Sequence, residues 1–77
     1  MTRIEVLGPG CAKCNVLYAH AEQAARELGI EFEIRKVTDI GAILGYGVMS
    51  TPALVVNGEV KLSGRVPSAE QLKGLLS

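Results

Sequence analysis

The two cysteines of this chain, Cys11 and Cys14, are separated by two residues and are the side chains best suited to carry out chemistry. A pair at this spacing can form a disulfide and open again, exchanging two electrons with another disulfide. The same pair can bind a soft or borderline metal ion. In a reducing compartment, an isolated Cys-x-x-Cys pair is more often catalytic or metal-binding than a structural crosslink.

The flanking sequence places this pair at the start of a helix. The apolar run Ile4–Leu7 predicts a strand, and a Gly-Pro-Gly break follows it. Residues 15–28 then follow the helical period, with one apolar face formed by Cys14, Leu17, Tyr18, Ala21, Ala24, Ala25 and Leu28. Cys14 falls near the centre of that face and Cys11 at its edge, which predicts one sheltered and one exposed cysteine.

The start of a helix also favours ionisation of a thiol. Helix N-termini carry partial positive charge and free N–H groups, both of which stabilise a thiolate. Lys13 adds a nearby cation, so we expect it to lower the pKa of Cys11.

Length, hydrophobic content and charge limit the kinds of protein that this chain could be. The 77 residues predict one domain over residues 1–77, and 48% of them are hydrophobic, enough for a dense core. Eight basic and eight acidic side chains cancel without forming a basic stripe, so neither nucleic acid nor an anionic membrane is an expected partner. We find no signal-peptide pattern and no apolar run of about 18 residues, so we expect a cytoplasmic protein.

A strand and a short helix are predicted after the first helix. Glu31–Val37 alternates apolar and charged residues, which predicts a half-covered strand at a sheet edge. Together with Ile4–Leu7 and the helix between them it forms a βαβ unit, so the two strands should be parallel. Asp39 can cap a second helix that runs to about Tyr46.

The remaining residues predict a hairpin and a final helix. Ala53–Val56 is apolar on both faces, which indicates a central strand, and Asn57-Gly58 predicts a tight turn into the antiparallel strand Val60–Ser63. Ser68 and Gln71 form a capping-box pattern before a leucine-rich face. We therefore expect an α/β fold with the order β-α-β-α-β-β-α, in which helices cover both faces of a four-stranded mixed sheet.

Together these features resemble the thioredoxin-fold disulfide oxidoreductases. The nearest likeness is to their small, glutaredoxin-sized, thioredoxin-like members, often called redox-active disulfide proteins. The resemblance spans essentially the whole chain. It rests on Cys11-Ala12-Lys13-Cys14 after the first strand, Thr51-Pro52-Ala53 entering the third, Asn57-Gly58-Glu59-Val60 at the hairpin, and Gly64 after the fourth strand.

The resemblance implies a role for each matching residue. Cys11 would be the exposed nucleophile and Cys14 the resolving cysteine, and their redox-active disulfide would serve in place of any other cofactor. Pro52 would be a cis proline beside the dithiol. Thr51 would pair its backbone with a substrate strand, and Gly64 would lie in the substrate groove.

The resemblance also implies an activity and partners. The protein would reduce or exchange disulfides of client proteins and would receive electrons from a thioredoxin-reductase-like donor, with a part in electron transport and cell redox homeostasis. We expect it to be a monomer. The Gly-Gly-Asp element with which glutaredoxins help to hold glutathione is missing near Gly64.

Two other interpretations of the cysteine pair stay open. A structural disulfide across so few residues would stabilise the fold by only about 2 kcal/mol in the loop-entropy formula. A metal-binding or thiol-carrier protein would use the pair without catalytic turnover, as small ferredoxin-like metal chaperones do. His20, which we expect to be exposed, lies a helical rise of about 9 Å beyond Cys14 and cannot complete a zinc site on a continuous helix.

Overall fold

The computed structural model describes residues 1–9 and 12–76, so the predicted nucleophile Cys11 lies outside the described residues. Seven elements follow one another in the predicted order: β1 (Thr2–Leu7), α1 (Ala12–Leu28), β2 (Phe32–Val37), α2 (Ile40–Gly45), β3 (Ala53–Val56), β4 (Glu59–Ser63) and α3 (Ala69–Leu76). The strands form one sheet in the order β2-β1-β3-β4. Strand β1 pairs with β2 in parallel and with β3 antiparallel, and β3 pairs antiparallel with β4. The predicted mixed sheet, with β2 at an edge and β3 inside, is confirmed.

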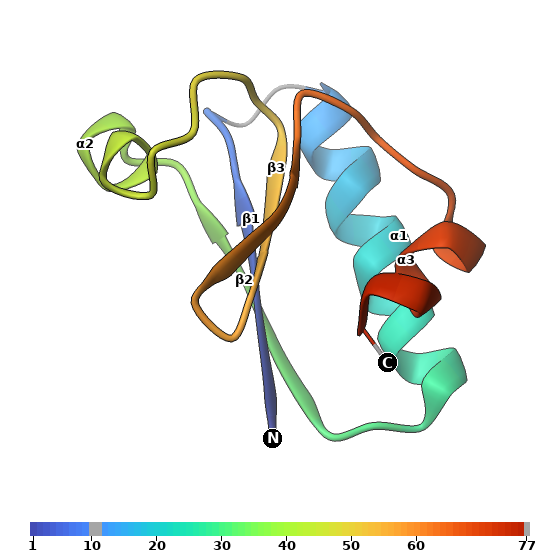
Figure 1. The fold of residues 1–77 in the computed structure, drawn as a ribbon. Helices are drawn as coiled ribbons and strands as arrows, with labels where there is room; N and C mark the ends of the chain where they lie inside the picture. The colour runs from blue at the N-terminus through green and yellow to red at the C-terminus, as the bar shows by residue number, and fades with distance from the viewer. Residues whose placement is uncertain (10–11, 77) are drawn as a thin grey trace.

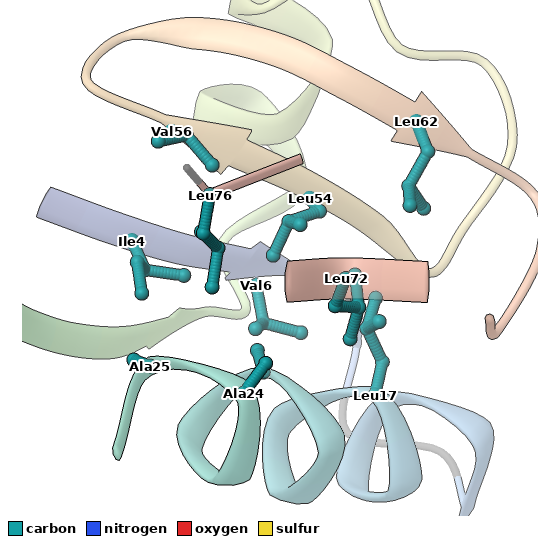
Figure 2. Close-up of a cluster of buried hydrophobic side chains, with 11 residues drawn as sticks. Ile4, Val6, Leu17, Ala24, Ala25, Leu54, Val56, Leu62, Leu72 and Leu76 are labelled. Carbon is teal, nitrogen blue, oxygen red and sulfur yellow. The ribbon is translucent and has the colours of Figure 1, made fainter. Parts of the chain in front are cut away.

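The sheet separates two layers of helix. Helices α1 and α3 lie side by side on one face, and α2 lies on the other (Figure 1). On the first face, Ile4 and Val6 of β1 point toward α1 (Figure 2). The alanines at positions 21, 24 and 25 of α1 are completely buried, and their small side chains let the helix approach the sheet closely.

The predicted apolar face of α1 is confirmed. Cys14, Leu17 and the three alanines are buried, while Tyr18 and Leu28 are half-buried at its margins. The helix ends before Gly29, whose φ of 68° is the left-handed conformation that glycine adopts without a Cβ penalty. The helix therefore holds Cys14 in its first turn with the side chain directed toward the sheet.

Local signals at the other ends of elements are also confirmed. Asp39 caps α2 by accepting a hydrogen bond of 2.9 Å from the Ala42 N–H. Asn57 and Gly58 both have positive φ, as a type I′ hairpin turn requires. Ser68 and Gln71 exchange hydrogen bonds of 3.1 and 3.3 Å, which is the predicted capping box.

Helices α1 and α3 are joined by an ion pair as well as by apolar packing. Lys73 Nζ lies 2.6 Å from Glu27 Oε1, and Gln23 donates a hydrogen bond of 2.7 Å to the same carboxylate. The hydrogen bond from Lys73 holds the pKa of Glu27 below its ordinary value, and the same bond raises the pKa of Lys73. The contribution of this pair to stability is therefore lost as pH falls through the lowered pKa of Glu27, or rises through the raised pKa of Lys73.

The sequence analysis missed the role of Glu5. This residue of β1 is only 9% exposed and lies on the sheet face that α2 covers. Its carboxylate accepts a hydrogen bond of 2.8 Å from the Tyr46 hydroxyl, and Arg35 Nε of β2 lies 4.0 Å away. The hydrogen bond raises the pKa of the Tyr46 phenol. The sequence did contain a signal for this role, because Glu5 is a charged residue inside the apolar run Ile4–Leu7.

The expectation for His20 was wrong. The side chain is half-buried, and its Nδ1 lies 2.9 Å from the carbonyl oxygen of Pro67, a hydrogen bond between α1 and the segment that leads into α3. Helical periodicity places a residue on a face of its own helix, but it does not show which distant segment packs over that face.

We predict that Tyr46→Phe lowers the free energy of unfolding by about 1–2 kcal/mol, because the buried Glu5 carboxylate loses its hydroxyl donor. Urea unfolding monitored by circular dichroism measures this change. Tyr18→Phe is the matched control, since the Tyr18 hydroxyl has no hydrogen-bond partner within the described residues. Equal unfolding midpoints for Tyr46→Phe and the parent would contradict the prediction.

Candidate active site

The described part of the dithiol is Cys14, which is 3% exposed in the first turn of α1. This burial agrees with the sheltered position that the helical pattern predicts for it. Cys11 precedes the first described residue of the helix, Ala12, so the structure gives no geometry for the second sulfur.

Gly8 lies directly against the Cys14 sulfur. Its N–H donates a hydrogen bond of 2.9 Å to the carbonyl of Val37, which continues the pairing of β1 with β2 by one residue. A Cβ atom at Gly8 would overlap Cys14 Sγ and would lie 3.3 Å from Cys14 Cβ. The sequence analysis treated Gly8 only as a chain break. The structure shows that its missing side chain is what lets the sulfur approach the backbone.

The same point of the backbone adjoins the Thr51–Pro52 segment. The Gly8 Cβ position is 3.8 Å from Thr51 Cβ, so Thr51 and Cys14 both lie next to Gly8. The Thr51–Pro52 peptide bond is cis, as the resemblance implies. Pro52 is buried and Thr51 is exposed.

Gly64, the residue after β4, is hydrogen-bonded to the Thr51–Pro52 segment. Its N–H donates a hydrogen bond of 2.8 Å to the carbonyl of Pro52, which extends the pairing between the two chain segments. Gly64 has a φ of 75°, and a Cβ there would lie 3.0 Å from Ser50 Cβ. Both the backbone conformation and the space available therefore favour glycine.

A groove of about 270 Å³ adjoins the start of α1. Its walls come from the first residues of α1 and from the segment after β4: Ala12, Lys13 and Val16 on one side, and Gly64, Arg65 and Val66 on the other. The structure thus brings the predicted residues Lys13, Cys14, Thr51, Pro52 and Gly64 together from three separate stretches of the chain. Val16 is a groove residue to which the sequence analysis assigned no site role, and Arg65 also lines the groove.

Residues 1–9 and 12–76 contain no group of three or more His, Cys, Asp or Glu side chains placed to hold a metal ion. Across the same residues, none of the helices combines the length and apolar character that a membrane span requires.

We predict that Gly8→Ala lowers the free energy of unfolding by about 1–3 kcal/mol, because the new methyl group must displace the Cys14 sulfur or the first turn of α1. Gly74→Ala is the matched control: its Cβ would meet no atom within 4 Å, and it should be neutral or stabilising by up to about 1 kcal/mol. Urea unfolding of both variants tests the contact. A Gly8→Ala protein as stable as the parent would rule it out.

Comparison of the sequence with known proteins shows the family to which this chain belongs. A sequence model of the thioredoxin domain family matches residues 2–77. A thioredoxin from Methanothermobacter thermautotrophicus is 43% identical over 77 residues, which cover the whole of both chains. A thioredoxin from Methanocaldococcus jannaschii is 40% identical over 73 residues, covering 95% of this chain and 84% of the relative. A probable thioredoxin from M. thermautotrophicus is 32% identical and covers 94% of this chain and 88% of the relative. The chain therefore belongs to the thioredoxin family of thiol–disulfide oxidoreductases.

Proposed function

We propose that this protein reduces or exchanges disulfides of client proteins through Cys11-Ala12-Lys13-Cys14. The observation that supports this most directly is the position of the buried Cys14 sulfur against Gly8, beside the exposed Thr51. A sulfur in this position is sheltered from solvent but lies close to a surface where a client chain can bind.

In the proposed reaction, the Cys11 thiolate attacks one sulfur of the client disulfide. The client S–S bond breaks, its second sulfur leaves as a thiolate, and a mixed disulfide joins Cys11 to the client. Deprotonated Cys14 then attacks the Cys11 sulfur and releases the second client thiolate. The client has gained two electrons and is reduced. The protein has lost the same two electrons, and Cys11 and Cys14 are now joined by a disulfide. A reductase or another dithiol protein returns the two electrons.

The two cysteines differ in the access that they need. The attacking sulfur must reach a disulfide on another molecule, and this is the role that we propose for Cys11, the residue before Ala12 in the sequence. The resolving sulfur needs to reach only its neighbour, and Cys14 is already buried at 3% exposure in the first turn of α1. Helix N–H groups and Lys13 would favour the thiolate form of Cys11.

Client binding is assigned to the segments around Gly8. Thr51 is exposed at the cis bond before β3, and Gly64 borders the groove while its N–H is bonded to Pro52. A client strand that paired with the Thr51 backbone would bring its disulfide to the start of α1. The protein would act as a cytoplasmic monomer, with the Cys11–Cys14 disulfide as its only cofactor.

We predict that Cys11→Ser and Cys14→Ser each reduce the rate of insulin disulfide reduction, in the presence of a dithiol donor, to the rate measured without protein. Each variant lacks one of the two sulfurs that the exchange requires. Lys61→Gln, on the far hairpin, is the control and should retain the parent rate. Parent activity in both cysteine variants would overturn the mechanism.

Elemental analysis separates this function from metal binding by the same pair. We expect the purified protein to carry no stoichiometric metal after dialysis. A one-to-one metal complex that survives dialysis, and is lost when the thiols are alkylated, would support the metal-binding alternative instead.

A further inference from the structure

The groove beside α1 carries positive charges that are not paired with acidic side chains of the described residues. Lys13 and Arg65 both line it, and neither has an ion pair or a side-chain hydrogen bond anywhere in residues 1–9 and 12–76. Five other basic side chains do have partners: Arg26, Arg35, Lys36, Lys61 and Lys73 contact Glu22, Glu5, Asn15, Glu59 and Glu27. The side chain of Arg3, in β1, also lacks such a partner within the described residues, but it does not line the groove. Lys13 and Arg65 are the basic residues that line it.

The groove also exposes apolar surface. Val16 is 45% exposed although it is a large apolar residue on α1, and it lines the groove with Ala12 on one wall and Val66 on the other. A volume of about 270 Å³ is below the range of roughly 300–1,000 Å³ that small-molecule sites occupy. The groove therefore suits one or two side chains of a docked polypeptide better than a whole cofactor.

We propose that this groove selects client proteins in which an acidic residue stands next to an apolar residue close to the reacting disulfide. The inference rests on the proposed function and specifies its substrate class. The apolar side chain would pack against Val16 and Val66, and the carboxylate would lie between Lys13 and Arg65. Because the groove begins at Ala12, immediately after Cys11 in the sequence, a client held there has its disulfide near the nucleophile.

Peptide disulfides test this selectivity directly. We would use three peptides that contain one cystine, a fixed neighbouring Leu, and Glu, Gln or Lys at the next position. The parent should reduce the Glu peptide with a kcat/KM about threefold to tenfold above that of the Gln peptide, and the Lys peptide should be slowest. The preference should shrink at 1 M salt, where the Debye length falls to about 3 Å.

Variants of the groove locate the source of the preference. Arg65→Gln and Lys13→Gln should each lower the Glu-to-Gln ratio, and Arg65→Glu should move it below one. The ratio is the readout because Lys13 can also alter the reactivity of Cys11 toward all three peptides equally. Lys61→Gln changes the net charge by the same amount away from the groove and should leave the ratio unchanged. A fourth peptide, with Ala in place of the fixed Leu beside Glu, tests the apolar contact: Val16→Ser should reduce the preference for the Leu peptide over this Ala peptide.

The possible results separate this inference from the proposed function. Equal rates for all three peptides would overturn the selectivity and leave the oxidoreductase function intact, whereas no reduction of any peptide would overturn the function itself. A Glu preference that persists in both Arg65→Gln and Lys13→Gln would place recognition elsewhere. Oxidised glutathione reduced faster than the Glu-Leu peptide would show that a small acidic disulfide, not a protein segment, fits the groove.

Discussion

The close approach of the Cys14 sulfur to the backbone of Gly8 is the contact around which the site is built. It requires a residue without a side chain just after β1, and a helix that starts at Ala12 with Cys14 facing inward. Because α1 is held to the sheet by Leu17 and fully buried alanines, the first turn has little freedom to move Cys14 away. One sulfur of the pair is therefore kept sheltered by the core itself.

The sheet brings the other segments to the same place. Strand β3 pairs with β1, so the Thr51–Pro52 bond that precedes β3 lies beside the carboxyl end of β1. Strand β4 pairs with β3, and the Gly64 N–H bond to Pro52 continues that pairing toward α1. Register alone thus aligns three stretches that are far apart in the sequence. The groove between α1 and residues 64–66 follows from that alignment.

Much of this arrangement could be predicted from the sequence because its signals are local. The period of α1, the Asn57-Gly58 turn and the Ser68–Gln71 capping box each depend on residues within a few positions of one another. What could not be predicted depends on distant partners. The contact between Gly8 and Cys14, and the bond between Glu5 and Tyr46, exist only once strands and helices have packed together. A glycine after a strand indicates a break in the chain, but its sequence context does not reveal what lies against its Cα.

The roles proposed for Cys11 and Cys14 are tested most directly by intact-mass analysis of single-cysteine variants incubated with a disulfide peptide. We expect the Cys14→Ser protein to accumulate a mixed disulfide with the peptide through Cys11, in up to one-to-one amounts. The Cys11→Ser protein should form almost none over the same time, because its remaining sulfur is buried. Adduct formation at the same rate in both variants would show that the burial of Cys14 does not separate the roles of the two cysteines.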